Sequence, residues 1–523
     1  MDSFMRRAAT AALLLYSSCA AGQDTTVSPT TTSPSTTEKT CATILAPSYT
    51  PPVVADGWSA QLVATGLKSP RGIKFDSKGG LLVVEAGSGL RHLTLQDSGG
   101  TCVSVKNSTS VFTDEKINHG LELSEDGTTL YISSSENVDR HSYDPDTKTV
   151  SNLQRLVANM SHSGPGHVTR TLLLSRHQPD LLLVSRGSMT NIDLMAANQS
   201  TGISQIRAFN ISNTTSETLM QRPYSYPDDG VLIGWGLRNS VGVAEHPLTG
   251  GIWSVENSAD NLSRLGRDIH EDNPGEELNF HGYLNDSSSL GRNHGYPSCF
   301  ALWNTTDFPG LGNLTVGSQF SVSNNATLND TTCAQHYTPP RLTFQAHTAP
   351  LDIKFLPSDA SLAFISFHGS WNRDHPAGYK LSYVAFNTST GEPAEPSDSV
   401  VAVKDVMTAA DVGACSKGVC LRPAGLAFDK KGERLFVSSD ATGEIWVVMK
   451  NGGWGEGNGG EGDAKTTSAG SEGPTGTETG RPVASTSSGA AVKRIGGGAR
   501  GEGCVAVVVT VGMVALGGLA FVG

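Results

Sequence analysis

Short apolar runs separated by turn residues fill the chain from residue 41 to residue 450, and one phrase recurs among them. An apolar strand leads into an acidic or Pro/Gly turn, and a second apolar strand follows. The six copies open at Arg71, His119, Arg170, Arg238, Leu351 and Arg422. We interpret each copy as a hairpin of the two central strands of one blade. The pattern therefore predicts an all-β fold, a six-bladed β-propeller over residues 41–450 with disordered N- and C-terminal tails.

The N-terminal end is typical of an exported protein. Arg6 and Arg7 precede an apolar run at residues 8–15 and the small residues at 19–21. This order predicts a secretory signal peptide over residues 1–21. Residues 22–40 are rich in Thr, Ser and Pro, and we expect them to form a solvated arm that buries no core.

The C-terminal end predicts a membrane anchor of the GPI type. Residues 451–488 are rich in Gly, Ser and Thr, which is typical of a flexible linker. Small residues, a polar spacer and an apolar tail follow within residues 489–523, as in a GPI-attachment signal. A transmembrane helix at residues 504–522 is the alternative, although no basic flank follows it. We expect a secreted protein held at the outer leaflet of the cell surface, with no other membrane contact.

Cysteine and asparagine usage agrees with export. Outside the two terminal signals six cysteines remain, and they allow fifteen pairings, of which the most local is Cys41–Cys102, Cys299–Cys333 and Cys415–Cys420. Acceptor sequences for N-glycosylation occur at Asn107, Asn159, Asn198, Asn210, Asn213, Asn261, Asn285, Asn304, Asn313, Asn325, Asn329 and Asn387. The formal net charge of −12 disfavours nucleic acid as a partner.

Aligning the six copies brings charged residues to equivalent places. The position that closes each second strand holds Glu85, Ser134, Arg186, Glu256, His368 and Asp440. In a propeller these positions and the strand-opening positions converge at one mouth of the central channel. Any single arginine there could simply brace two blades. The set Arg71, Arg186, Arg238, His368 and Arg422, however, predicts a cationic ring that binds a polyanion.

Two further features of the repeat suggest chemistry. His119 is an imidazole at a strand-opening position with a glycine after it, which makes it the best candidate for a general base. The polar turn at residues 256–260 leaves the fourth copy at the same mouth. Its oxygens could hold calcium, or it could be an ordinary turn rich in Asn and Asp. Residues 272–279 are acidic and turn-forming but lack the spacing of a dedicated metal loop.

The chain resembles the fungal PQQ-dependent pyranose dehydrogenases, also described as L-sorbosone dehydrogenase-like and related to soluble quinoprotein glucose dehydrogenases. The resemblance covers almost all of residues 41–450. The phrases that carry it are Ser69-Pro-Arg-Gly-Ile, Asn118-His-Gly-Leu, Gly234-Trp-Gly-Leu-Arg-Asn, Asn273-Pro-Gly-Glu-Glu-Leu, Ala346-His-Thr-Ala-Pro, Phe367-His-Gly-Ser-Trp-Asn-Arg and Leu421-Arg-Pro-Ala-Gly.

This resemblance implies a site for pyrroloquinoline quinone (PQQ) and calcium at the mouth of the propeller. The family pattern assigns cofactor binding to Arg71, Arg238, Asn239, His368 and Arg422, with Arg186 added from the cationic ring. It assigns the base to His119, which takes the hydroxyl proton of a sugar while hydride passes to PQQ. It assigns calcium to the carbonyl oxygens of Ser258 and Ala259, where bacterial relatives carry a Gly-Pro pair.

Other functions remain open at this stage. A calcium-dependent hydrolase of the lactonase or esterase kind should surround its metal with carboxylates and Asn, whereas this ring is rich in arginine. A non-catalytic carbohydrate-binding propeller at the cell surface needs no cationic ring. A family member that has lost its cofactor is the third alternative. The resemblance implies a pyranose or ketoaldose as the substrate. The sequence shows no attached cytochrome domain, so we expect an external electron acceptor, such as a cytochrome or a copper oxidase-type partner.

Overall fold

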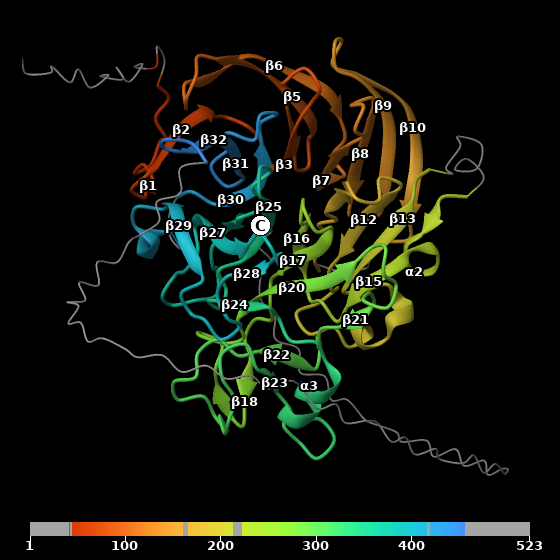
Figure 1. The fold of residues 1–523 in the computed structure, drawn as a ribbon, viewed down its shortest axis with the longest axis vertical. Coiled ribbons are helices and arrows are strands. Elements are labelled where there is room, and N and C mark those ends of the chain that lie inside the picture. Colours follow the sequence, from red (N-terminus) through yellow and green to blue (C-terminus); the bar gives the residue numbers. More distant parts are fainter. Residues whose placement is uncertain (1–40, 42–43, 161–165, 213–221, 416–418, 455–523) are drawn as a thin grey trace, which may run out of the picture. The chain divides into compact units, whose positions relative to one another are not determined.

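In a computed structural model of the chain, residues 41, 44–160, 166–212, 222–415 and 419–454 are described. Six sheets of four to six strands are arranged around a central axis (Figure 1), and two further sheets have two strands each. This is the predicted six-bladed β-propeller. The predicted signal peptide, the Thr/Ser/Pro arm, most of the linker and the GPI-attachment signal lie outside the described residues.

Blades 1 to 3 follow one another along the chain. Blade 1 contains β3 (Pro70–Phe75), β4 (Leu81–Glu85), β5 (Gly89–Asp97) and β6 (Val103–Thr113). Blade 2 contains β7 (Ile117–Leu123), β8 (Thr129–Ser134), β9 (Val138–Asp144), β10 (Thr149–Ala158) and β14 (Tyr224–Ser225). Blade 3 contains β11 (Leu172–Leu174), β12 (Leu181–Arg186), β13 (Gln205–Asn210), β15 (Val231–Trp235) and β21 (Arg292–Asn293). The short helix α2 (Tyr226–Asp229) precedes β15.

Blades 4 to 6 complete the ring. Blade 4 contains β16 (Ser240–Glu245), β17 (Gly251–Glu256), β20 (Glu276–Tyr283) and β24 (Leu342–Phe344). Blade 5 contains β25 (Pro350–Phe355), β26 (Leu362–Phe367), β27 (Lys380–Asn387), β28 (Glu392–Pro393), β29 (Val403–Thr408) and β1 (Val53–Val54). Blade 6 contains β30 (Pro423–Phe428), β31 (Leu435–Ser439), β32 (Glu444–Lys450) and β2 (Trp58–Ala64).

All six predicted hairpins form, but they are the innermost pair of strands in each blade rather than the middle pair. The strand order in blade 1 is β3-β4-β5-β6, and the first strands β3, β7, β11, β16, β25 and β30 contact one another in a closed circle around the axis. The repeated phrase therefore marks the lining of the central channel. This is why residues at its two ends are close enough to build one site.

The ring is closed by strands from both ends of the described chain. β2 pairs antiparallel with β32, and β1 pairs with β29 one blade earlier. Blade 6 thus combines the first long strand with the last three. Such a pairing ties the two ends of the propeller together through the backbone hydrogen bonds of a single sheet.

The hydrophobic core is divided into layers between neighbouring blades. Between blades 4 and 5, Trp253 and Leu278 pack against Ile353 and Phe367, and comparable clusters fill the other interfaces. Because each sheet is covered on both faces, inner strands such as β4 are buried at every residue and read as continuous apolar runs. The prediction of strands from such runs is confirmed.

A β-bulge at the start of the first strand recurs in five blades. In blade 1 the register shifts between Pro70 and Ile73, and equivalent shifts occur in β7, β16, β25 and β30. A bulge leaves its residues out of the ladder and re-aims their side chains. Arg71 and His119 lie within such bulges, whereas Arg238 and Arg422 precede them.

Glycines beside the opening residues let the inner strands approach closely. A Cβ atom on Gly72 would lie 2.2 Å from the carbonyl oxygen of His119, and one on Gly425 would lie 2.2 Å from that of Arg71. Gly120 is confined in the same way by Arg170. The glycine in each of these phrases is required by the packing of one blade against the next.

A lobe inserted between β17 and β24 extends from blade 4 (Figure 1). It contains β18 (Ser263–Arg264), β19 (Arg267–Asp268), β22 (Cys299–Ala301), β23 (Gln319–Ser321) and α3 (Asp330–His336). The disulfide Cys299–Cys333 joins β22 to α3, and Cys41–Cys102 and Cys415–Cys420 also form. The most local of the fifteen pairings is confirmed.

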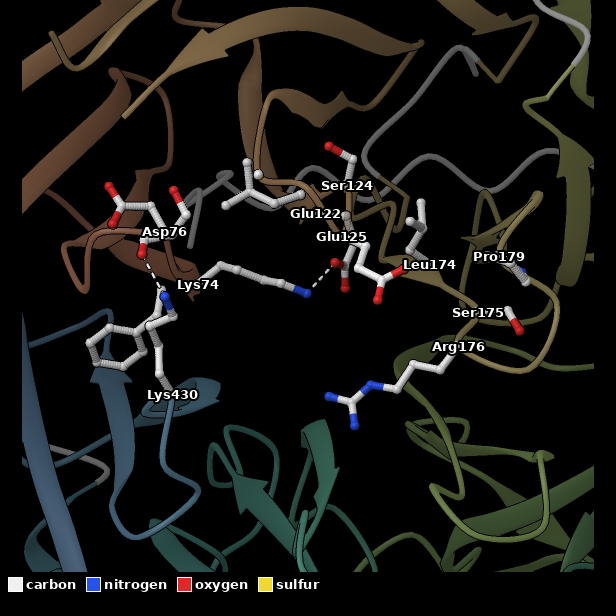
Figure 2. Close-up of a pocket in the computed structure, with 14 residues that line it drawn as sticks. Lys74, Asp76, Glu122, Ser124, Glu125, Leu174, Ser175, Arg176, Pro179 and Lys430 are labelled. Atoms are coloured by element: carbon white, nitrogen blue, oxygen red, sulfur yellow. Dashed lines mark hydrogen bonds and ion pairs between the residues drawn. The ribbon is translucent and has the colours of Figure 1, made fainter. Parts of the chain in front are cut away.

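The central channel has a second end, opposite the strand-opening residues. Its cavity is lined by residues of the first strands, including His119, and by residues of the following turns such as Lys430. Figure 2 shows the pocket at the far end, where Lys74 pairs with Glu122 and further cations reach in from blades 3 and 6. Cations and carboxylates alternate there, so this pocket lacks the one-sided charge that a polyanion requires.

Candidate functional site

Residues from four blades form one connected network at the mouth. Arg71 donates through Nε to Nδ1 of His119 at 3.3 Å and through Nη1 to Asp440 at 2.6 Å. Asp440 also accepts from Nε2 of His368 at 2.7 Å. Arg422 donates through Nε to the carbonyl oxygen of His368 at 3.2 Å. The structure therefore brings together four of the predicted site residues and adds Asp440, which sequence reasoning had aligned without assigning it a role.

The contact from Arg71 fixes the tautomer of His119. A guanidinium only donates, so Nδ1 of His119 must accept and its lone pair is directed at Arg71. In the neutral ring the proton is then on Nε2. A substrate hydroxyl that replaced Arg71 as the donor would meet the same lone pair, so Nδ1 is the atom suited to take a proton.

Burial keeps the imidazole of His119 neutral. Its side chain is buried, and this desolvation, followed by the nearby charges of Arg71 and Lys354, lowers the pKa of His119 well below its usual value. The carboxylate of Asp440 opposes the shift but does not reverse it. A base must be unprotonated before it can act, and His119 meets this condition at neutral pH.

Asp440 is the anionic centre of the network. Burial would raise the pKa of Asp440, but the imidazole of His368 and the guanidinium of Arg71 outweigh it and hold the pKa below its usual range. Burial lowers the pKa of His368 against the opposing charge of Asp440. We interpret the pair as a neutral imidazole that donates to an ionised carboxylate, with Arg71 balancing the charge.

Arg422 and Arg71 each have a guanidinium nitrogen that no described acceptor uses. Arg422 donates to the carbonyl oxygens of His368 and Gly369, and its guanidinium lies over the ring of Tyr379 at 5.2 Å. Within the described part of the chain, no acceptor bonds Nη1 of Arg422 or Nη2 of Arg71. Guanidinium groups that are half-buried with unused donors are well suited to carboxylates.

Arg238 is more deeply engaged with the protein. Its Nη2 binds Asp260 at 2.8 Å and the side-chain oxygen of Asn191 at 2.9 Å, and Nη1 donates to the carbonyl oxygen of Asn257 at 3.2 Å. Arg238 therefore holds the turn after β17 in place, besides adding positive charge at the mouth. Asn239 supports the same turn, because its carbonyl oxygen accepts from the backbone of Asn257 at 3.0 Å.

The predicted calcium turn has two buried carbonyl groups without donors. Ser258 and Ala259 are 8% and 0% exposed, yet no described donor reaches either carbonyl oxygen. The neighbouring backbone groups of Asn257 and Asp260 are all hydrogen-bonded. Buried carbonyl oxygens are normally paired, so these two are candidates for a cation that takes oxygen ligands.

Buried carboxylates lie behind this turn. Glu276 accepts from the backbone N–H of Ser258 at 2.7 Å, and Glu256 and Glu277 both accept from Asn279. Burial raises the pKa of Glu277 to about 7 and that of Glu256 well above its usual range. Across the described residues, no group of three or more His, Cys, Asp or Glu side chains is arranged to bind a metal. A cation here would therefore depend on the backbone carbonyls.

Arg186 lies apart from the network around Asp440. It donates to the carbonyl oxygen of Thr201 at 3.2 Å, and its guanidinium lies 5.9 Å from the ring centre of Tyr226. Arg170 and Arg207 belong to the same region of blade 3, where Tyr226 is fully buried. The structure thus joins Arg71, His119, His368 and Arg422 directly and links Arg238 with Asn239, but shows Arg186 in a separate environment.

The residue types at the mouth fit both expected groups. The unused guanidinium donors fit the carboxylates of PQQ. The carbonyl oxygens of Ser258 and Ala259, which accept no hydrogen bond from a described donor, fit calcium. Sequence reasoning missed Asn191, Asp260 and Glu276 as supports of the turn. Asp260 belonged to the turn identified in the sequence, whereas Asn191 and Glu276 come from other segments and no local pattern connects them with it.

The chain belongs to the TrAA12-like family, whose pattern matches residues 52–451. It is 49% identical over 430 residues to the pyrroloquinoline quinone-dependent sugar dehydrogenase of Hypocrea jecorina (strain QM6a), covering 81% of this chain and 96% of the relative. It is 37% identical over 411 residues to the pyrroloquinoline quinone-dependent pyranose dehydrogenase of Coprinopsis cinerea. That match covers 76% of this chain and 54% of the longer relative.

Solved structures agree with this assignment. A calcium structure of a Trichoderma reesei family AA12 protein is 50% identical, with a TM-score of 0.75, and covers 79% of this chain and 100% of its own. The holo form of the PQQ domain of Coprinopsis cinerea pyranose dehydrogenase is 35% identical, with a TM-score of 0.72. It covers 78% of this chain and 99% of its own. The predicted family and fold are both confirmed.

Proposed function

We propose that the protein is a quinoprotein dehydrogenase that oxidises pyranoses or ketoaldoses with PQQ and Ca²⁺. The observation that carries the proposal is the network at the mouth, in which the lone pair of a neutral His119 lies beside half-buried arginines with unused donors. The names of the relatives point to the same cofactor and substrate class. A lactonase-like hydrolase or a sugar-binding propeller would need neither feature.

Each part of the site has a role in this proposal. PQQ, when bound, supplies the acceptor for the two electrons that leave the sugar as hydride. Arg71 and Arg422 bind its carboxylates, with His368 and Asn239 as further polar contacts and Arg238 and Arg186 as sources of positive charge. The carbonyls of Ser258 and Ala259 hold Ca²⁺. Nδ1 of His119 takes the proton of the sugar hydroxyl.

A spectroscopic titration tests the proposal. We expect the absorbance of PQQ to shift on addition of the purified protein with CaCl₂, and to saturate at one PQQ per chain. Removing calcium with a chelator should weaken the binding, because the cation would offset charge on the cofactor. An unchanged PQQ spectrum over the whole titration would reject the cofactor assignment and favour a sugar-binding propeller.

The electron acceptor is proposed to be a separate protein, such as a cytochrome or a copper oxidase-type partner. Regeneration of the oxidised cofactor requires an acceptor for its two electrons. Stopped-flow mixing of sugar-reduced enzyme with a candidate cytochrome would show the transfer directly as reduction of the haem.

Export and surface anchoring are proposed from the two ends of the sequence. The glycosylation acceptors agree, because those that the structure describes are exposed or half-buried; Asn213 lies outside the described residues. No helix within the described residues is long and apolar enough to span a membrane. We expect phosphatidylinositol-specific phospholipase to release the protein from cells. Recovery of the peptide 504–523 from mature protein would contradict a GPI anchor.

A further inference from the structure

Glu276 connects two turns that come from different blades. It is the first residue of β20 and is 2% exposed. One carboxylate oxygen, Oε2, accepts from the backbone N–H of Ser258 at 2.7 Å, and the other, Oε1, accepts from that of Ala349 at 3.1 Å. Ser258 lies in the turn that follows β17 within blade 4, and Ala349 lies in the turn that leads into blade 5. Both oxygens of a single buried carboxylate are thus used for backbone positions beside the mouth.

The turn after β17 is hydrogen-bonded through its backbone at Asn257, at the N–H of Ser258 and at Asp260, whereas no described partner bonds the carbonyls of Ser258 and Ala259 or the N–H of Ala259. Asn257 is bonded at both its N–H and its carbonyl, and the N–H and carbonyl of Asp260 both bind the side chain of Asn191. Glu276 provides the remaining contact, to the N–H of Ser258. The contact with Glu276 orients the peptide between Asn257 and Ser258, which directly precedes the two peptides that carry the carbonyls of Ser258 and Ala259.

The second contact of Glu276 makes it a rigid support. Ala349 has a φ of 53° and His347 has a φ of 63°, a conformation that residues with a side chain adopt at a cost. The turn is held by the bond from Ala349 to Glu276 and by the bond between Nε2 of His347 and the carbonyl oxygen of His270. Because both oxygens of the carboxylate accept from backbone N–H groups, Glu276 is held in one position against the turn that contains Ser258.

We propose that Glu276 is a positioning residue for the cation site, because its carboxylate fixes the carbonyl oxygens of Ser258 and Ala259 in the orientation that binds Ca²⁺. This inference rests on the proposed function, which assigns Ca²⁺ to those carbonyls. Groups behind the direct ligands commonly govern metal affinity in this way, since they orient the ligands without touching the metal. The buried negative charge of the carboxylate also favours a cation at the turn.

The chain offers a matched control in the next residue. Glu277 is also buried, at 5% exposed, but its carboxylate binds the side-chain amide of Asn279 and makes no contact with the turn. Substituting either glutamate by glutamine removes one buried carboxyl group with little change in shape. Only Glu276→Gln places an NH₂ group against a backbone N–H of the two turns, where two donors would face each other.

The experiment is a calorimetric titration of CaCl₂ into the full-length protein and its variants. We expect Glu276→Gln to weaken calcium binding about tenfold to a hundredfold, the usual range for groups that orient metal ligands. Glu277→Gln should change calcium affinity less than about threefold, and PQQ affinity measured without calcium should stay within the same range in both variants. If Glu276→Gln does not fold, Glu276→Asp replaces it. Aspartate keeps the charge but is too short to reach both turns, and it should weaken calcium binding as well.

The outcomes separate this inference from the proposed function. Equal calcium affinity in wild type and Glu276→Gln, or equal losses in Glu276→Gln and Glu277→Gln, would overturn the positioning role while leaving the cation site intact. A wild-type protein that binds PQQ but no calcium would overturn the assignment of calcium to the turn, and the role of Glu276 with it.

Discussion

We expect the His119→Ala enzyme, reconstituted with PQQ and calcium, to turn over about a hundredfold to ten-thousandfold more slowly than wild type. This is the usual contribution of a positioned general base. The affinity for PQQ should change little, because a neutral imidazole that accepts a bond from Arg71 adds no positive charge to the mouth. The measurement is steady-state turnover on a panel of aldoses, ketoaldoses and deoxy sugars with an artificial acceptor.

Two other results would reassign the base. Near-normal turnover of His119→Ala would transfer the role to His347 or His368, the other imidazoles at the mouth. Loss of PQQ binding in the same variant would make His119 a ligand of the cofactor. Thermal unfolding of the variant serves as the control, since His119 is buried and its loss removes packing as well as a base.

The pH dependence of the wild-type enzyme follows from the same environment. Burial and Arg71 lower the pKa of His119 below the ordinary value of 6.5, so the ring gains a proton only under acidic conditions. The protonated ring cannot accept a second proton. We therefore expect kcat/KM to be constant around neutral pH and to fall on acidification, with a midpoint below 6.5 that His119→Ala abolishes. A midpoint above 6.5 would contradict a buried, neutral base.

We expect Arg422→Ala to bind PQQ more weakly by about 2–4 kcal/mol, or roughly thirtyfold to a thousandfold in Kd. The variant loses a guanidinium that is held in place by the carbonyl oxygens of His368 and Gly369 and by the ring of Tyr379. Arg422→Lys keeps the charge but loses the planar fork, so its affinity for PQQ should lie between those of wild type and Arg422→Ala. The measurement is a PQQ titration followed by absorbance at fixed calcium.

Arg434→Ala is the matched control for this prediction. Arg434 lies in the same hairpin of blade 6 but at the far end, where it pairs with Asp97 and Asp429. Its loss should reduce stability while leaving PQQ affinity within about threefold, because it is remote from the mouth. Similar losses of PQQ affinity in Arg422→Ala and Arg434→Ala would show that overall charge, and not the site, governs binding.

Much of the fold could be predicted because its repeat is local. Each hairpin combines two adjacent strands and a turn, and the sequence from Arg71 to Glu85 contains all three. The closing of the ring could not be predicted in the same way. Nothing in the pattern of β2 indicates that its partner is β32, because this pairing depends on the whole ring having formed. The inner position of the hairpins likewise follows from contacts between blades.

The site was predictable as far as the alignment of the repeats reached. Arg71 and His119 occupy equivalent positions inside the bulges of their first strands, as the alignment predicted. The alignment was wrong for Arg422, which precedes β30, so that the equivalent residue of blade 6 is Ala424. The alignment of the repeats could not predict hydrogen bonds between residues of distant segments. Asp440 binds Arg71 across the junction of the last and first blades, and Glu276 binds Ser258 from a strand eighteen residues later. Such contacts are set by tertiary packing, which a single sequence does not encode locally.

The most direct test of the account is the reduction of bound PQQ by sugar in the absence of any acceptor. The protein is loaded with one equivalent of PQQ and excess calcium, and each sugar of the panel is added while the spectrum is recorded. The account predicts that at least one pyranose or ketoaldose converts the bound cofactor to its reduced spectrum in a single turnover, and that His119→Ala slows this conversion. Bound PQQ that stays oxidised with every sugar would contradict it.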